Sequence, residues 1–516
     1  MALPADAATI NVGADCSLVD AIESANTETG VNMCEQGAGA DIIILPAAYS
    51  LSLNAGNYLY TSLAGYAYYS ALPTINSEIT IQGSGGSDAI IERAGTTDDF
   101  RLLAVEAYSS LTLESITLRG GQLTGPNSSG AGIYAKDASL TIVNSTISGN
   151  SANVGGGIAL QNCAYFMMNA STVSDNSVSN AGGGIYAFYP ATISITNSSV
   201  SANRSGSFGA GIAVVGDTSN VDISGGFIAD NVADPASEYG LGGGIYVFDA
   251  ILNISEVSIS NNSAYIGGGL HADDSIVEIE KSTLSENTAL FGGAGVYLAD
   301  ASIDIIKTTI STNITDSQGG GVFHSGGIGS SFKLRDSTLS GNLGAIGSAL
   351  YLAAETKEIR SSTIYHNSAS GSGIDAASVV SIGPPDVIVN TIIAGSNTAD
   401  CYFGVGLPTI VNNSSWFADA SCDGAGQGRP LLNPLANNNQ GLANSTLTHA
   451  PSLGSAVLGI GDTGVCALYG ASDQRGAPRG VVSCDIGAVE GGIEGEFETS
   501  CFVLKASNDN VINFCL

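Results

Sequence analysis

A Gly-centred phrase that recurs along the chain constrains the fold more than any other feature of the sequence. Two small residues, a Gly and an aliphatic residue follow one another ten times between Gly132 and Ile374, at spacings of 24 to 33 residues. The central position is occupied in turn by Gly132, Gly157, Gly184, Gly211, Gly244, Gly269, Gly295, Gly321, Ala349 and Gly373. A regular period of this length is typical of repeat proteins, in which each repeat stacks on its neighbours.

A second phrase, of the type Asn-Ser-Thr-Ile-Ser-Gly-Asn, runs in step with the first. Its last residue recurs at Asn150, Asn176, Asn203, Asn231, Asn262, Asn287, Asn313, Asn342, Asn367 and Asn397. Asn tolerates a left-handed backbone, and its amide can hydrogen bond to the same amide of the next repeat. We therefore expect these residues to form an inward or turn-forming ladder.

The apolar residues within each repeat alternate with a period of two, which predicts strands. Leu140 and Ile142 precede Ile147 in this way, and an aliphatic residue such as Ile158 follows each Gly. A repeat of roughly 26 residues with three short strands has no room for the crossover of about a dozen residues that a βαβ unit needs. The sequence therefore predicts an all-β, right-handed parallel β-helix of about 10–12 coils.

Composition limits the partners of this chain of 516 residues. It has 47 acidic against 15 basic residues and a net charge of -32, so nucleic acid and anionic membrane surfaces are poor partners. No run of 18 apolar residues occurs, so we expect no transmembrane segment. The first residues lack a signal-peptide pattern, and we expect Met1 to begin an engineered or processed chain.

Eight of the nine Cys residues form close pairs outside the repeats. We predict four local disulfides, each worth about 3 kcal/mol to stability, and an oxidising, extracellular or cell-surface location. The ninth residue, Cys163, is predicted to be a buried free thiol. The predicted pairs are Cys16 with Cys34, Cys401 with Cys422, Cys466 with Cys484, and Cys501 with Cys515.

The ends of a solenoid expose unpaired strand edges and need caps. Ser17-Leu18-Val19-Asp20 is a capping-box pattern, and Leu18, Ile22 and Ala25 form an apolar stripe, so we predict a short N-terminal capping helix. The run Cys16-Ser17-Leu18-Val19-Asp20-Ala21-Ile22, followed by Asn26, Cys34, Gly39-Ala40-Asp41-Ile42 and Leu45-Pro46, resembles the CSLREA domain of bacterial surface β-helix proteins. Val19 and Asp20 replace the Arg and Glu of that motif.

Near the other end, two runs resemble the "choice-of-anchor Q" domain of the same proteins. They are Ser472-Asp473-Gln474-Arg475-Gly476-Ala477-Pro478-Arg479 and Cys484-Asp485-Ile486-Gly487-Ala488-Val489-Glu490. The resemblance implies a bacterial extracellular protein. We predict a CSLREA-like cap at 1–60, the parallel β-helix at 61–400, terminal coils with an anchor-Q-like cap at 401–490, and a disulfide-stapled tail at 491–516.

Aromatic residues recur two positions after the Gly phrase, where the strand alternation turns them outward. This column, widened by two Phe residues four positions after the Gly, gives the predicted binding residues Tyr134, Tyr186, Phe188, Tyr246, Phe248, His271, Tyr297, Phe323 and Tyr351. Aromatic faces with a polar tip suit sugar rings or a protein partner. In-register stacking that stabilises the wall, under a covering loop, is an equal alternative.

The sequence gives little support for catalysis or for a required metal ion. No catalytic residue is predicted, because the acid, His, Arg and Lys patterns of β-helix pectate lyases and polygalacturonases are missing. No cofactor is required, although Asp273 and Asp274 can contribute to a Ca²⁺ site. We predict a non-catalytic surface, adhesion or matrix protein that binds a polysaccharide or surface protein and can self-associate. The alternatives are a Ca²⁺-dependent polysaccharide lyase or hydrolase, and a filament subunit joined through its caps.

Overall fold

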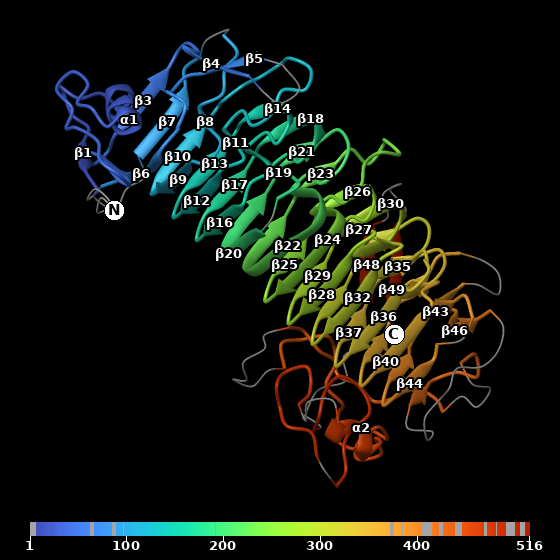
Figure 1. The fold of residues 1–516 in the computed structure, drawn as a ribbon. Coiled ribbons are helices and arrows are strands. Elements are labelled where there is room, and N and C mark those ends of the chain that lie inside the picture. Colours follow the sequence, from blue (N-terminus) through green and yellow to red (C-terminus); the bar gives the residue numbers. More distant parts are fainter. Residues whose placement is uncertain are drawn as a thin grey trace. The chain divides into compact units, whose positions relative to one another are not determined.

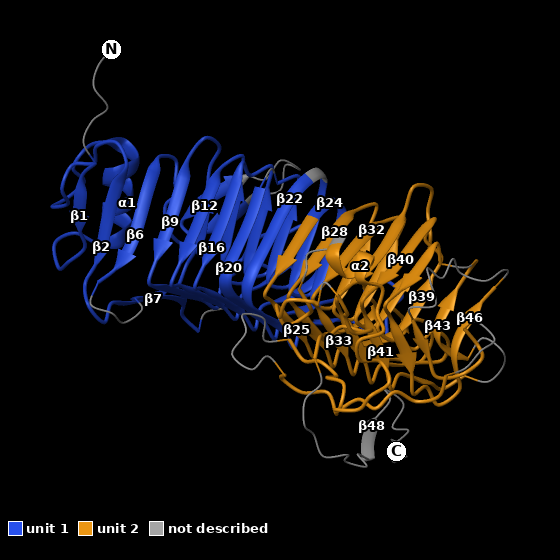
Figure 2. Ribbon diagram, turned by 90° about the horizontal axis from the view of Figure 1, so that it is seen from below, with its two compact units in different colours: residues 1–240, 244–251 blue, residues 241–243, 252–516 orange. Residues whose placement is uncertain are grey.

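The computed structural model describes most of the chain, in two compact units. The described residues are 7–61, 67–84, 89–95, 98–190, 192–371, 376–383, 385–404, 415–422, 427–438, 446–468, 472–480, 482–491, 501–505 and 511–515. Unit 1 comprises residues 1–240 and 244–251, and unit 2 comprises residues 241–243 and 252–516 (Figure 2). Each unit is described by itself.

The N-terminal helix of unit 1 forms as the sequence predicts. Helix α1 (Leu18–Thr27) is capped by Ser17, whose hydroxyl accepts a hydrogen bond from the backbone N–H of Asp20 at 3.1 Å. Leu18, Ile22 and Ala25 are buried. Strand β1 (Thr9–Asn11) pairs in parallel with β2 (Asp41–Leu45).

Each coil of unit 1 contributes strands to parallel columns, in which every strand pairs with its equivalent in the next coil (Figure 1). The first strands, which follow the Gly phrase, are β8 (Leu103–Val105), β11 (Ile133–Lys136), β15 (Ile158–Gln161), β19 (Ile185–Phe188) and the start of β22 (Ile212–Ala229). The second are β2, β6 (Glu78–Gly83), β9 (Ser110–Glu114), β12 (Ser139–Val143), β16 (Tyr165–Asn169) and the start of β20 (Thr192–Ser201). The third are β3 (Ser50–Leu53), β7 (Ala89–Arg93), β10 (Ile116–Arg119), β13 (Thr146–Ser148) and β17 (Thr172–Ser174).

Unit 2 repeats this pattern. Its first strands are β27 (Leu270–Asp273), β31 (Val296–Ala299), β35 (Val322–His324), β39 (Leu350–Leu352), β43 (Ala377–Ser381) and β46 (Ala399–Phe403). The second are β28 (Ile276–Glu280), β32 (Ser302–Ile306), β36 (Ser331–Arg335), β40 (Thr356–Arg360) and β44 (Val387–Val389). The third are β25 (Ser258–Ser260), β29 (Thr283–Ser285), β33 (Thr309–Ser311), β37 (Thr338–Ser340), β41 (Thr363–Tyr365), β45 (Ile392–Ala394) and β47 (Trp416–Phe417).

Several coils have a fourth short strand, which the three-strand pattern does not predict. It follows the ladder Asn, where the chain makes only a few ladder hydrogen bonds before the next Gly phrase. In unit 1 these strands are β14 (Ser151–Val154), β18 (Ser177–Ala181), β21 (Arg204–Ser205) and β23 (Val232–Ala233). In unit 2 they are β26 (Ser263–Ile266), β30 (Thr288–Gly292), β34 (Ile314–Thr315), β38 (Leu343–Gly344) and β42 (Ser368–Ala369).

The remaining elements are two antiparallel hairpins, one long strand that continues the first and second columns, and a short helix. Strands β4 (Tyr58–Thr61) and β5 (Ala67–Ser70) form an antiparallel hairpin. Strand β24 spans Ile245–Ser255, and helix α2 spans Thr463–Leu468. Strands β48 (Cys501–Lys505) and β49 (Val511–Cys515) pair in antiparallel fashion. No helix among the described residues is long and apolar enough to cross a membrane.

The Asn column forms the predicted inward ladder in both units, except at Asn397, which is exposed and whose amide donates to the carbonyl of Ala369 instead. In unit 2 the side-chain amide of Asn287 donates to the side-chain oxygen of Asn313 at 2.9 Å, and the backbone N–H of Asn287 donates to the same oxygen at 3.0 Å. The pattern repeats from Asn262 to Asn367, and in unit 1 from Asn150 to Asn231. All of these residues are buried, so the ladder satisfies polar groups that water does not reach.

One predicted register is wrong near the end of the repeats. The backbone of Ala349 donates to the carbonyl of Ser378, and Leu350 pairs with Val379, so Ser378 occupies the position that we expected for Gly373. Gly373 itself lies outside the described residues. The chain between Asn367 and Ser378 has more residues than the chain between Asn342 and Ala349, so the Gly phrase does not directly precede the strand.

Lys281, Lys307 and Lys333 recur at a spacing of 26 residues but do not form one stack. Lys281 and Lys307 occupy equivalent turns, each with a positive φ. Lys333 lies within β36, opposite Asp304 of the previous coil. The coil between them is longer than 26 residues, and the turn residue equivalent to Lys307 is Asp336, because the backbone of Lys307 donates to Arg335.

Three of the four predicted disulfides are present: Cys16 with Cys34, Cys401 with Cys422, and Cys466 with Cys484. Cys163 is a buried free thiol, as predicted. Cys501 lies opposite Cys515 in the pairing of β48 with β49, but the side chains of this predicted pair lie outside the described residues.

We expect reduction of the Cys16 to Cys34 bond to lower the stability of the N-terminal cap by about 3 kcal/mol, because a closed loop of this size restricts the unfolded chain. Non-reducing peptide mapping checks the three linkages, and the Cys16→Ser, Cys34→Ser double variant checks the energy by urea unfolding. Recovery of Cys16 and Cys34 as free thiols from protein purified without a reductant would contradict both the pairing and the extracellular location.

The segment after β47 folds back along the side of the coils in unit 2. The side-chain oxygen of Gln474 accepts from Thr338 at 2.6 Å, and its amide donates to Thr309 at 3.0 Å, so this residue binds the third strands β33 and β37. Arg479 pairs with Asp336 at 2.8 Å, and both side chains are buried. The motif that resembles the anchor-Q domain therefore holds this segment against several successive coils.

Candidate binding surface along the first strands

The predicted aromatic residues lie on the outer face of the first strands, in register with one another. In unit 1, Tyr134 is opposite Ala159, Ala159 is opposite Tyr186, and Tyr186 is opposite Ala213. In unit 2 the corresponding column contains an aromatic ring or a His in four successive coils. These four residues, which we call the aromatic ladder, are His271, Tyr297, Phe323 and Tyr351.

The rings of the aromatic ladder stack face to face. Their centroids are 4.8 Å apart from His271 to Tyr297, 4.8 Å from Tyr297 to Phe323, and 4.9 Å from Phe323 to Tyr351. The last two pairs are nearly parallel, with interplanar angles of 12° and 11°. This spacing is that of neighbouring strands in a sheet, so strand pairing alone brings the rings into contact.

A Gly four residues before each ring makes room for it. Gly293 has a φ of 59°, and a Cβ built on it would lie 2.6 Å from the Cβ of Tyr297. Gly319 stands in the same relation to Phe323, with a φ of 65° and a separation of 2.6 Å. The first Gly of the phrase therefore has two roles: it adopts the positive φ of the tight turn, and its missing Cβ leaves space for the ring residue.

The prediction of a fully outward-facing stripe is wrong for four of its members. Tyr134, Tyr246, His271 and Phe323 are buried, with exposed fractions of 2%, 9%, 4% and 7%. In unit 2 the neighbouring rings of the aromatic ladder stack on His271 and Phe323. In unit 1 other side chains of the chain pack on Tyr134 and Tyr246. Tyr186, Phe188, Phe248, Tyr297 and Tyr351 are half-buried, so they keep an accessible edge.

In unit 1 the chain itself covers part of the column. Tyr60 of the hairpin packs edge-on against Tyr134, with centroids 5.2 Å apart, and the guanidinium of Arg101 lies 4.8 Å from the centre of the Tyr134 ring. Burial lowers the pKa of Arg101 to about 10. The hydroxyl of Tyr134 donates to Gln161 at 2.5 Å. Tyr134 is thus part of the core, as the alternative of a covered structural stack predicts.

The other rings of unit 1 have neighbours beside the column. Tyr246 packs against Phe208, with centroids 4.8 Å apart. Phe188 packs edge-on against Tyr189 at 4.4 Å. Burial raises the pKa of the Tyr186 hydroxyl. Tyr134 and Tyr246 are buried, whereas the Tyr186 ring is half-buried and accessible on the outer face of the first strands.

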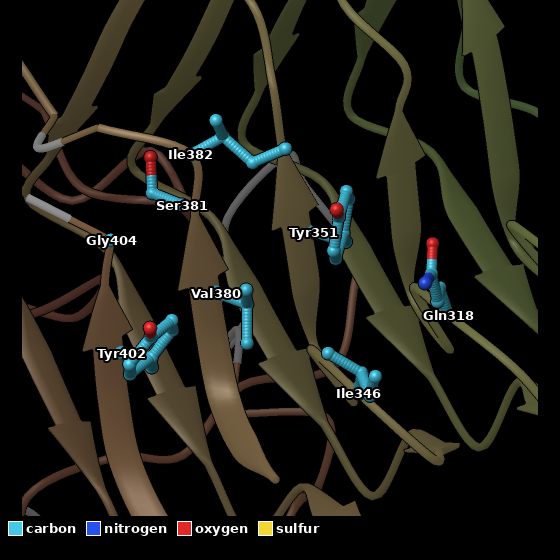
Figure 3. A pocket seen from close by; sticks show the side chains of 8 residues that line it. All are labelled: Gln318, Ile346, Tyr351, Val380, Ser381, Ile382, Tyr402 and Gly404. Atoms are coloured by element: carbon cyan, nitrogen blue, oxygen red, sulfur yellow. The ribbon is translucent and has the colours of Figure 1, made fainter. Parts of the chain in front are cut away.

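A cleft of about 240 Å³ opens at the end of the aromatic ladder (Figure 3). Tyr351 stands on one side and Tyr402 on the other, with Val380 on the strand between theirs. The residues that line it are Gln318, Ile346, Tyr351, Val380, Ser381, Ile382, Tyr402 and Gly404. Sequence reasoning missed Tyr402, because no Gly phrase precedes it and only the strand pairing places it in the column.

The predicted metal ligands Asp273 and Asp274 lie together with Asp300, their ligand atoms within 4.8 Å of one another. Asp300 joins them because the turns after β27 and β31 stack, and the backbone of Asp274 donates to Ala299 at 3.0 Å. Burial raises the pKa of Asp273, and the charges of Asp274 and Asp300 raise it further. Ca²⁺ takes six to eight oxygen ligands, so these three carboxylates would supply only part of such a site.

The comparison with protein families agrees with this architecture. The family model described as "Right handed beta helix region" matches residues 105–275. None of the curated proteins compared with the chain matches it. A crystal structure of the pectate lyase Pel9A is similar with a TM-score of 0.33 and 11% sequence identity, over 94% of this chain and 96% of that chain. We draw no functional conclusion from so distant a likeness. The parallel strand columns and the family match together show that the chain is a right-handed parallel β-helix protein of about 11 turns.

Proposed function

We propose that the protein is a non-catalytic extracellular β-helix that binds polysaccharide along the aromatic ladder and serves adhesion or a surface matrix. The observation that carries this proposal is the stack of His271, Tyr297, Phe323 and Tyr351, which ends at an open cleft. Aromatic faces and edges with polar tips are good surfaces for sugar rings. The resemblance of the two ends to CSLREA and anchor-Q domains supports the surface location.

Two further features support binding outside the cell. The three disulfides favour an oxidising compartment. The regular spacing of the ladder matches an extended ligand better than a compact one, since rings recur at 4.8 to 4.9 Å along the wall. A polysaccharide that lies along the wall meets the half-buried rings of Tyr297 and Tyr351, since His271 and Phe323 are buried. Two such contacts strengthen binding without new kinds of contact.

We expect Tyr297→Ala to weaken polysaccharide binding by roughly 1 to 3 kcal/mol, the range of a central contact residue. Tyr165→Ala is the matched control, because Tyr165 is 38% exposed on the second-strand column of unit 1 and is not part of the aromatic ladder. Isothermal titration with a polysaccharide that binds the wild type gives the affinities, and thermal melting of the same samples gives the folded fraction. A Tyr297→Ala variant that melts early but binds normally would remove the proposal.

The lyase alternative is tested in the same samples. Cleavage by a lyase introduces a double bond into the product, which absorbs in the ultraviolet. We expect no rise in absorbance when the protein is incubated with polygalacturonate or alginate, with and without added Ca²⁺. A steady rise that depends on protein concentration would replace the proposed non-catalytic function with an enzymatic one.

A further inference from the structure

Beyond Tyr351, the column that contains the aromatic ladder lacks a ring at one position and has a ring again at the next. Tyr351 pairs with Val380, and Val380 pairs with Tyr402, so Val380 occupies the rung between two tyrosines. The four rings before this position stack at 4.8 to 4.9 Å without interruption. Figure 3 shows Val380 between the two Tyr side chains, with the cleft around it.

The gap lies above the side chain of Val380, which is itself only 4% exposed, and ideal strand spacing makes the gap about one ring wide. Neighbouring parallel strands lie about 4.8 Å apart, so equivalent atoms of Tyr351 and Tyr402 are separated by two strand spacings, roughly 9.6 Å. A ring placed midway would lie about 4.8 Å from each Tyr ring, as the rings of the ladder lie from one another. The cleft, of about 240 Å³, is smaller than the roughly 300–1,000 Å³ sites of drug-sized ligands, so it fits a single ring.

The lining favours an uncharged ligand with hydroxyl groups. None of the eight described residues that line the cleft carries a charge, and the whole chain has a net charge of -32, which repels anionic ligands. Val380, Ile346 and Ile382 supply apolar surface. The Gln318 amide and the hydroxyls of Ser381 and Tyr402 supply the donors and acceptors of the lining, and hydroxyl groups of a ligand can pair with both kinds of group.

In unit 1, an aromatic ring from another part of the chain packs into the space next to a column ring. There the Ala residues on either side of Tyr134 in the column, Ala104 and Ala159, leave space that Tyr60 fills. Tyr60, Ala104, Tyr134 and Ala159 form one buried cluster. In unit 2 the corresponding space beside Tyr351 is the open cleft among the described residues.

We propose that the cleft between Tyr351 and Tyr402 binds one pyranose ring of a neutral polysaccharide, which completes the aromatic ladder. This inference rests on the proposed function and specifies its ligand class. A pyranose chair carries C–H groups on both faces and is thicker than a flat aromatic ring, so it contacts both Tyr faces at once. The rest of the polysaccharide extends from the cleft along the exposed edges of the ladder.

Filling the gap with a side chain tests the proposal. In the Val380→Phe variant we expect the new ring to occupy the cleft and to weaken binding of hydroxyethyl cellulose or glucomannan at least tenfold, while the melting temperature is unchanged or raised. Ile276→Phe is the matched control, because it adds the same ring at a 60% exposed position of β28 and is expected to leave binding unchanged. Affinity electrophoresis in gels with and without each polysaccharide measures binding.

The outcomes separate this inference from the proposed function. A wild-type protein that none of the polysaccharides retards would overturn both. Wild-type retardation by polygalacturonate or alginate but by neither neutral polymer would overturn the inferred ligand class. If Tyr297→Ala weakens binding but Val380→Phe does not, the ladder binds without the cleft, and only this inference is overturned. Should Val380→Phe fail to fold, Tyr402→Ala removes one wall of the cleft without adding volume, and normal binding by that variant would also overturn it.

Discussion

Replacement of Asn287 by Ala is expected to lower the free energy of unfolding by about 3 to 5 kcal/mol. The side-chain oxygen of Asn287 accepts from the backbone N–H and the amide of Asn262, both at 3.0 Å. Its amide donates to Asn313 and to the carbonyl of Ile259, both at 2.9 Å. The variant leaves several of these buried groups without a partner, and each such group costs about 1 to 3 kcal/mol.

Urea unfolding of matched variants checks this expectation. Asn153→Ala is the control, because its amide makes one exposed hydrogen bond, to Ser179, and we expect a change under about 0.5 kcal/mol. Asn287→Leu keeps most of the volume and loses the same hydrogen bonds, so it is expected to be about as unstable as Asn287→Ala. Full recovery in Asn287→Leu would mean that Asn287 contributes by packing, which contradicts the role we assign to the ladder.

Replacement of Arg479 by Met is expected to cost a similar amount, about 3 to 5 kcal/mol, and to release the C-terminal segment from the coils. The guanidinium of Arg479 donates to Asp336 at 2.8 Å and to the carbonyl of Gly487 at 2.8 Å. Removal of one partner of a buried ion pair leaves the other charge uncompensated. Burial raises the pKa of Asp336 even in the presence of Arg479.

The loss of stability in Arg479→Met is expected to become smaller as the pH falls. Near pH 7, Asp336 is ionised and hydrated in the unfolded chain. Without Arg479, burial of this charged carboxylate in the folded chain therefore destabilises the fold most at this pH. As the pH falls toward 4, Asp336 takes up a proton and the penalty shrinks. We therefore expect Arg479→Met to differ most from the wild type at pH 7 and less at pH 5.

Limited proteolysis and melting at both pH values measure the effect. Cleavage within residues 427–491 is expected to be faster in Arg479→Met than in the wild type. Arg204→Met, which changes an exposed residue of β21, is the control. The double variant Arg479→Met, Asp336→Leu is expected to recover much of the stability, because it removes both charges. A pH-independent loss would show that Arg479 acts through packing of its side chain alone.

The repeats could be predicted from the sequence because their information is local and periodic. Each Gly phrase and each ladder Asn sits next to the strand that it helps to form, so spacing alone gives the coil. The capping helix and the pairs such as Cys16 with Cys34 are local in the same sense. These features involve residues that are close in the chain or one coil apart.

The site could be predicted only in part, because burial depends on residues far away in the chain. Nothing near Tyr134 in the sequence shows that Tyr60 will cover it. Gln474 binds Thr309 across 165 residues, and no periodic pattern encodes such a contact. Tyr402 enters the column only through the pairing of β43 with β46, after a turn whose length breaks the repeat.

The Asn ladder has a consequence for how such a chain can change length. Every coil from Asn262 to Asn342 presents an amide donor to the coil that follows, and every coil from Asn287 to Asn367 presents an amide oxygen to the coil that precedes. A duplicated coil therefore finds an amide donor on one side and an amide oxygen on the other wherever it is inserted. After deletion of a coil, the two coils that become neighbours can still form these hydrogen bonds. The gene can grow or shrink by whole coils without a polar mismatch in the core, whereas an insertion of part of a coil would break the ladder at once.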